Sequence, residues 1–246
     1  MNILVDVRER LARRIAGEIV LAEDPGKVMR RWRELFHVSQ ITLAEYLEVS
    51  PSVISDYEAN RRKSPGTKTI KRFVEALLDI DGRRGNPVTS ALGRLMDVEI
   101  PSSIILDARE FISPVSAKRL CHAIGAEPLT PSELLDKELS GYIVVESKAM
   151  LKDLSSEGYA KLYQASVGRS LILVNASTGR SLTVTIKGNK HKPGLLILHG
   201  VSKLDPATLS LVENEKIPLA VTKEVTVEEL IKLLRQFSQQ VNLSPP

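Results

Sequence analysis

Apolar side chains recur at intervals of three and four positions in the first part of the chain, the spacing that puts them on one face of a helix. The first stripe predicts a helix over residues 3–22, ended by the turn formers at 24–26. Its apolar members are Leu4, Val7, Leu11, Ile15 and Ile19. The same periodicity predicts four further helices, at about 27–36, 40–47, 51–59 and 67–79.

From residue 141 onward the pattern changes to short apolar runs rich in β-branched residues, which alternate with helical stretches. Strands are expected at 141–147, 170–176, 181–187, 194–200 and 217–222. Helices are expected at 150–163, 206–215 and 227–237. Continuous apolar runs are typical of strands that are buried on both faces. The pattern therefore predicts a mostly parallel sheet covered by helices.

The stretch between these two regions has a weaker pattern. Residues 88–96 look helical, 103–108 resemble either a short strand or a helical turn, and 113–125 look like a helix that ends at Gly125. Residues 81–87 combine Asp, Gly, Arg, Asn and Pro, a composition typical of a linker.

Residues 39–64 carry the most informative local pattern. Ser39 can cap a helix that begins at Gln40, a tight turn follows at 48–50, and a second helix opens at Pro51. Two short helices joined by such a turn form a helix-turn-helix, which lays its second helix in the DNA major groove. Ala44 fits this frame because a small side chain lets the two helices approach. The other positions expected to face inward are Leu43, Leu47, Val49, Ile54 and Tyr57.

Taken together, these residues resemble the DNA-binding domain of Cro/repressor-type regulators, the XRE family. The resemblance covers about residues 26–80 and is carried by Ser39-Gln40, Leu43-Ala44, Val49-Ser50, Ile54-Ser55 and Glu58 at the family's intervals. It implies a five-helix domain, usually dimeric on DNA. It also implies that Gln40 contacts a phosphate, that Ser52 and Ser55 approach base edges, and that residues 60–63 bind the DNA backbone. The expected DNA-binding residues are Gln40, Thr42, Pro51, Ser52, Val53, Ser55, Asp56, Asn60, Arg61, Arg62, Lys63 and Lys68.

Two positions depart from the family pattern. Glu48 stands where the turn usually has glycine, and a left-handed backbone there costs a non-glycine residue roughly 1 kcal/mol. Pro51 stands where a glutamine or arginine often reads bases, and proline has no donor to offer. We therefore expect short contacts, such as Ser52 or Val53 to base edges, together with recognition of DNA shape.

The distribution of charge agrees with a DNA partner. The whole chain of 246 residues has a net charge of +4, whereas Gly26–Arg72 alone carries +5, so the remainder is −1. Lys and Arg concentrated around the second helix are expected where phosphates are neutralised. A surplus of this size also occurs on ordinary solvated surfaces, so it supports the motif without deciding it.

Composition excludes several other classes of protein, among them disulfide-bonded, membrane-spanning and secreted proteins. A single cysteine, Cys121, excludes an intramolecular disulfide and is more often a small buried apolar residue. No apolar run reaches the roughly 20 residues needed to span a bilayer. Charges spread over the first 21 residues exclude the apolar core of a signal peptide. We expect a soluble, cytoplasmic protein without membrane contact.

The sequence gives no catalytic constellation. Its four histidines, His37, His122, His191 and His199, lack metal-ligand spacing, and no P-loop, GxGxxG or GxSxG motif is present. His199 ends an expected strand where a parallel sheet would bind a ligand, although a surface histidine is the simpler interpretation. We expect no catalytic residue, metal or cofactor and no enzyme activity; the ligand residues, if any, stay unknown.

The expected organisation has three parts and a mixed fold, α plus α/β. Residues 1–82 form an all-helical helix-turn-helix domain with an extra N-terminal helix, 83–130 a helical connector, and 131–246 a small α/β regulatory or dimerisation domain. Residues 194–234 resemble, without the name-giving motif, the DRTGG-type α/β domains found beside regulatory modules.

The leading hypothesis is a sequence-specific transcriptional regulator that binds double-stranded DNA as a homodimer on a near-palindromic operator. Its C-terminal domain would dimerise, with helix 3–22 as the other candidate, and could bind a small-molecule effector. Two alternatives stay open. One is an adaptor of the transcription machinery that selects no DNA sequence, and the other is a DNA-targeted enzyme acting on a small molecule.

Overall fold

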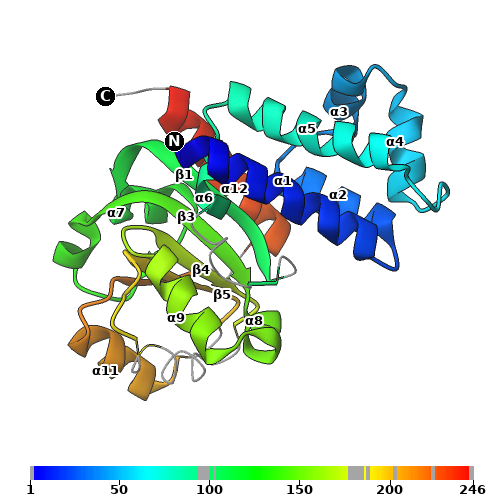
Figure 1. Cartoon of the computed structure of the whole chain (residues 1–246). Helices are drawn as coiled ribbons and strands as arrows, with labels where there is room; N and C mark the ends of the chain where they lie inside the picture. The colour runs from blue at the N-terminus through cyan, green and yellow to red at the C-terminus, as the bar shows by residue number, and fades with distance from the viewer. Residues whose placement is uncertain are drawn as a thin grey trace. The chain divides into compact units, whose positions relative to one another are not determined.

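The computed structural model describes residues 3–93, 100–101, 104–176, 186, 189–201, 204–222 and 225–243, with side chains from residue 7 onward. The chain divides into two compact units, Met1–Met96 and Asp97–Pro246. The first is helical and the second contains the sheet, so the expected fold class is confirmed (Figure 1). No helix among the described residues is long and apolar enough to cross a membrane.

The first unit is built from six described helices. They are α1 (Ile3–Leu21), α2 (Pro25–Leu35), α3 (Gln40–Leu47), α4 (Pro51–Glu58), α5 (Thr67–Arg83) and α6 (Pro87–Gly93). The predicted helix positions are thus confirmed, with α5 extending four residues further than expected. Helix α1 packs against α2, α5 and α6, and its predicted stripe supplies the buried Leu11, Ile15 and Ile19.

The second unit contains a six-stranded sheet in the order β1-β3-β4-β5-β6-β2. The four central strands, β3 (Glu138–Glu146), β4 (Ser170–Val174), β5 (Leu195–His199) and β6 (Leu219–Thr222), run parallel. The edge strands β1 (Ile105–Ser116) and β2 (Glu127–Pro128) pair antiparallel with β3 and β6. The sheet is therefore mostly parallel, as predicted.

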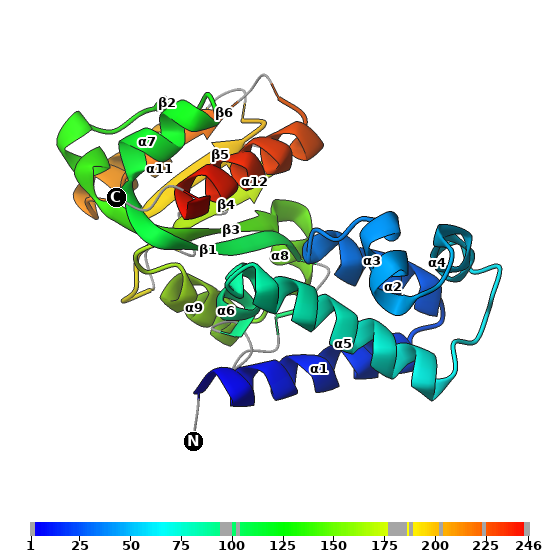
Figure 2. The same cartoon turned by 90° about the horizontal axis from the view of Figure 1, so that it is seen from above.

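Helices cover both faces of this sheet. Helices α7 (Ala117–Ala123) and α12 (Val227–Leu243) pack on one face, where Leu120 and Leu234 join Val144 and Ile197 in one apolar cluster. The crossovers between parallel strands contain α8 (Ser147–Asp153), α9 (Ser156–Ala165) and α11 (Pro206–Asn214); α9 lies on the other face (Figure 2). A short 3₁₀ helix, η1 (Ser132–Asp136), leads into β3.

Three expectations need correction. The range 83–130 is not a helical connector, because it contains β1, which pairs with β3 over most of its length. The predicted helix 113–125 begins only at Ala117, where Ser116 accepts a hydrogen bond from the backbone of Arg119. The single helix expected at 150–163 is two helices, divided at Leu154. The strand expected at 181–187 lies outside the described residues, apart from Ile186.

Candidate nucleic-acid interface

The two helices of the motif begin and end as the sequence predicts. Ser39 caps α3, because its hydroxyl oxygen accepts a hydrogen bond of 2.9 Å from the backbone N–H of Thr42. Glu48 ends α3 in the left-handed conformation, with φ 54° and ψ 45°. Pro51 occupies the first turn of α4. Ala44 is 1% exposed, so the crossing of the two helices depends on its small size.

The left-handed Glu48 gives a direct test of the turn. Glu48→Gly is expected to raise the free energy of unfolding by about 0.5–1 kcal/mol, because glycine adopts this conformation without a Cβ clash. Glu45→Gly is the matched control: it lies in the interior of α3 and is also exposed, so it should lower stability by about 1 kcal/mol. Urea unfolding of both variants measures the two values. A loss of stability in Glu48→Gly would contradict the prediction.

A buried ion pair fixes the far end of α4. Arg33 of α2 donates from Nε and Nη2 to the two carboxylate oxygens of Glu58, over 2.5 and 2.8 Å. The Arg33 Nη1 donates to the carbonyl of Val38, at 2.8 Å. The two side chains are 10% and 3% exposed. This bidentate pair holds the end of α4 against α2.

Gln40 belongs to the same network. Its amide nitrogen donates to the carboxylate of Glu58 over 2.8 Å, so its side chain links the start of α3 to the end of α4. The contact between Gln40 and a phosphate stays a prediction. The sequence did not predict the role of Arg33. The available indication was Glu58, a position of the family pattern, because a buried carboxylate needs a positively charged partner.

The predicted base-reading residues lie on α4 with different exposures. Pro51 and Ser52 are exposed, and the Ser52 hydroxyl lies 2.8 Å from that of Ser50. Val53 is half-buried and lines a cavity behind the helix, so it does not point fully outward. Ser55 is half-buried and accepts a hydrogen bond of 3.2 Å from Arg61. Their roles in DNA binding stay predictions.

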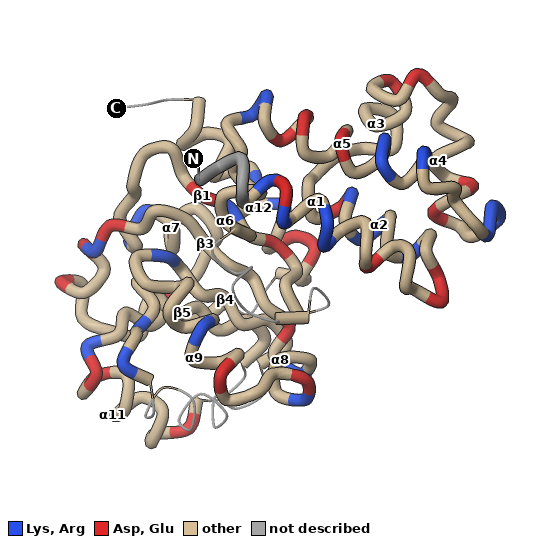
Figure 3. The backbone as a smooth tube through the Cα atoms, viewed as in Figure 1, with Lys and Arg blue, Asp and Glu red and all other residues tan. Residues whose placement is uncertain are grey.

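Basic side chains follow α4 in the loop that leads to α5 (Figure 3). Arg61 donates to the carboxylate of Asp56 over 2.7 Å, and the Arg62 guanidinium lies 5.6 Å from the centre of the Tyr57 ring. Both arginines are exposed, as are Lys63 and Lys68. Asp56, expected among the DNA-binding residues, thus orients Arg61 in this structure. The loop begins at Asn60, which is left-handed with φ 57°.

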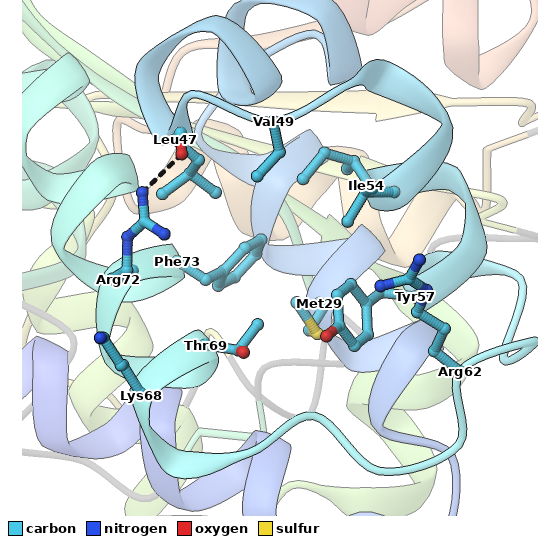
Figure 4. A pocket seen from close by; sticks show the side chains of 11 residues that line it. Met29, Leu47, Val49, Ile54, Tyr57, Arg62, Lys68, Thr69, Arg72 and Phe73 are labelled. Atoms are coloured by element: carbon cyan, nitrogen blue, oxygen red, sulfur yellow. Dashed lines mark hydrogen bonds between the residues drawn. The ribbon is translucent and has the colours of Figure 1, made fainter.

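A cavity of about 420 Å³ lies between α2, the end of α3, α4 and α5 (Figure 4). Its walls are mainly apolar and its rim is basic, where Arg72 donates a hydrogen bond to the carbonyl of Leu47. The lining residues are Met29, Leu47, Val49, Val53, Ile54, Tyr57, Arg62, Lys68, Thr69, Arg72 and Phe73. The expectation that Val49 and Tyr57 complete the core is met only in part, because both stay half-buried at this cavity.

Two reactive groups of the second unit, Cys121 and His199, are buried. Burial raises the pKa of the Cys121 thiol to about 11, which makes it a weak nucleophile at neutral pH. One ring nitrogen of His199, Nε2, lies 2.7 Å from the carbonyl oxygen of Val225. Its Nδ1 is buried and has no hydrogen-bond partner among the residues that the structure describes. Within the described part of the chain no group of three His, Cys, Asp or Glu could hold a metal ion.

Comparison with known proteins decides the family. A helix-turn-helix family model (HTH_3, XRE-type) matches residues 29–77. A relative from Methanocaldococcus jannaschii, named an HTH-type transcriptional regulator, is 39% identical over 231 residues, which are 93% of this chain and 95% of the relative. A second relative, from Archaeoglobus fulgidus, has the same type of name. It is 38% identical over 228 residues, which are 92% of this chain and 96% of that relative.

The chain belongs to the HTH-type transcriptional regulators. No solved structure matches it. The family model covers α3, α4 and parts of α2 and α5 in this regulator, and the two relatives extend over nearly the whole chain, including the sheet. The XRE resemblance is therefore confirmed. The DRTGG-type resemblance of the second unit stays a prediction.

Proposed function

We propose that this transcriptional regulator binds a specific DNA sequence as a homodimer, with α4 in the major groove. The observation that carries the proposal is the exposed start of α4 followed, at its other end, by the basic loop of Arg61, Arg62 and Lys63. A helix presented in this way can enter the groove while the loop neutralises phosphates. To bind a phosphate, Arg61 would either leave its ion pair with Asp56 or contact the phosphate while the ion pair stays formed.

Sequence preference would come from short side chains and from DNA shape. Ser52 and Ser55 can exchange hydrogen bonds with base edges, but neither offers the bidentate geometry of Arg or Gln. Pro51 offers no donor. Few strong base contacts leave a larger share of the discrimination to groove width and DNA flexibility. Selection of binding sites from random DNA by the purified protein tests this. A chain that selects no sequence would instead act as an adaptor of the transcription machinery.

Replacing Arg61, Arg62 and Lys63 together by Ala is expected to weaken DNA binding about thirtyfold at moderate salt and to reduce the slope of log K against log salt by up to about 2.7. The reason is the loss of three cations that would displace counterions from DNA. Gel-shift titrations at several salt concentrations measure both quantities. Lys118, Lys148 and Lys152 lie in the second unit, and their triple Ala variant is the matched control. Unchanged affinity and slope in the loop variant would contradict the proposal.

Dimerisation would place two copies of α4 roughly 34 Å apart, one DNA turn, on a near-palindromic operator. We propose that the second unit makes the contact. Ile112 on the edge strand β1 is 62% exposed and Leu243 at the end of α12 is 82% exposed. The two segments adjoin, because the Ile112 N–H donates to the Asn242 side chain. Exposed large apolar side chains on neighbouring segments are typical of contact surfaces.

The variant Ile112→Ser/Leu243→Ser is expected to weaken the dimer about tenfold or more, since each replacement removes apolar surface from the contact. Analytical ultracentrifugation over a range of protein concentrations measures the effect. Leu151→Ser, an exposed leucine on α8 outside this surface, is the control. A dimer that is unchanged in the double variant would move the contact elsewhere, with α1 as the next candidate.

Effector sensing by the second unit is proposed on one observation: the buried His199, at the carboxyl end of β5, has an Nδ1 for which the described part of the chain offers no partner. Ligands of parallel α/β sheets bind at this end of the strands. Thermal-shift screening of the full chain against metabolites tests the proposal, with His199→Phe as the comparison. Turnover of a bound compound would favour the alternative that this unit is an enzyme.

A further inference from the structure

The cavity of the helix-turn-helix unit has the dimensions of a small-molecule site. Its volume of about 420 Å³ falls within the range of roughly 300–1,000 Å³ that is usual for such sites. Four of its wall residues, Met29, Leu47, Ile54 and Phe73, are almost fully buried, and their side chains face the cavity (Figure 4). A ligand that enters would therefore meet a mainly apolar interior formed by four helices and the turn after α3.

The rim of the same cavity carries only positive charge. Arg62 comes from the loop after α4, whereas Lys68 and Arg72 come from the first turns of α5, one helical turn apart. No Asp or Glu is among the described residues that line the cavity. Three cations around an apolar interior complement a molecule with one anionic group and an apolar body.

We propose that this cavity binds an amphipathic monoanion, an alkyl carboxylate whose chain occupies the apolar interior and whose head group pairs with Lys68, Arg62 and Arg72. A polar anion such as phosphate would leave the apolar walls without contacts. Arg62 already lies 3.8 Å from the carboxylate of Asp56. An uncharged alkyl ligand would leave Lys68 and Arg72 without a carboxylate partner among the described residues. Only a ligand with both parts uses both features of the site.

The position of the cavity couples this ligand to DNA binding. Val53, Ile54 and Tyr57 form the inner side of α4, so a bound chain would contact the back of the helix that is proposed to enter the major groove. Arg62 belongs to the loop proposed to neutralise phosphates, and Lys68 is among the expected DNA-binding residues. A carboxylate that occupies them competes with DNA, and coupling of this kind acts in both directions. This consequence rests on the proposed function; the ligand site itself does not.

Calorimetry of the full-length protein without DNA tests the site directly. Octanoate is expected to bind saturably at one molecule per chain, and octanol, which has the same chain length without the charge, about fivefold or more weakly. Lys68→Gln should weaken octanoate binding about fivefold. Lys63→Gln, which changes an exposed lysine of the loop before α5 that does not line the cavity, should leave octanoate binding unchanged. Absence of saturable octanoate binding, or equal binding of octanol, would overturn the proposal.

Two further measurements test whether the ligand occupies this cavity and whether it weakens DNA binding. Thr69→Phe fills the cavity from α5 and should abolish octanoate binding; if this variant does not fold, Lys68→Gln decides. In gel shifts with wild-type protein, octanoate at ten times its Kd should lower the DNA affinity about tenfold if binding is mutually exclusive. Octanoate that binds but leaves DNA affinity unchanged would overturn the coupling. A chain that binds octanoate and no DNA would overturn the proposed function and leave the site standing.

Discussion

Replacing Arg33 by Met is expected to lower the free energy of unfolding of the helix-turn-helix unit by about 3–5 kcal/mol. The carboxylate of Glu58 is 3% exposed and receives two of its hydrogen bonds from Arg33. The variant therefore leaves a buried negative charge that keeps, among the described residues, the hydrogen bond from Gln40. Such a charge cannot be hydrated without opening the packing of α4 on α2. Urea unfolding followed by the fluorescence of Trp32, the only tryptophan of the chain and a residue of α2, measures the loss.

A double replacement separates the charge from the packing. Arg33→Met/Glu58→Leu removes both members of the pair and keeps their volume, and buried pairs replaced in this way often lose little stability. We therefore expect the double variant to regain most of the unfolding free energy lost in Arg33→Met. A double variant that is as unstable as the single one would show that the hydrogen bond from Arg33 to Val38, not the unpaired carboxylate, dominates.

Gly26→Ala is expected to destabilise the same unit by up to about 3 kcal/mol. A Cβ at position 26 would lie 2.1 Å from the backbone oxygen of Tyr57, and that oxygen belongs to α4 itself rather than to a flexible side chain. Relief of the clash needs α2 and α4 to separate, which would displace α4 from its position beside α3. We expect DNA affinity to fall together with stability, as measured by urea unfolding and gel shift on the same preparation.

Gly66→Ala provides the matched control, because a Cβ at position 66 meets nothing within 4 Å and this glycine has a φ of −65°. Gly66 is the N-cap residue of α5, a position where glycine is preferred to alanine, so we expect Gly66→Ala to lower the free energy of unfolding by no more than about 1 kcal/mol. Equal effects of the two replacements would contradict a specific close approach of α2 and α4.

The local parts of the site were predictable because they depend on neighbouring residues. Ser39 has a hydroxyl at the position where a helix start needs an acceptor, and Pro51 fixes a helical φ at the first turn of α4. The bounds of α3 and α4 therefore follow within one residue of the prediction. The left-handed Glu48 was expected from the resemblance, because the family usually has glycine at this position of the turn, even though a glutamate side chain does not favour that conformation.

Elements that depend on distant partners were less predictable. Strand β1 contains Pro114 and was expected in part as helix. Its pairing with β3 accommodates the proline because the register shifts between Glu110 and Val115, and proline is tolerated at such irregularities and on edge strands. Nothing within the segment itself specifies β3 as its partner.

The sequence by itself determined the helix-turn-helix with its caps and turn, the basic loop, and the alternation of strands and helices beyond it. Each of these features depends on residues that lie within about two helical turns of one another in the sequence. Only the tertiary structure decided that Arg33 and Glu58, 25 residues apart, form one buried ion pair, and that the Gln40 side chain donates a hydrogen bond to this pair. It also decided that Val53 and Tyr57 border a cavity with a basic rim. The reason is physical: burial and pairing depend on which helix faces cross, and a linear pattern does not contain that geometry.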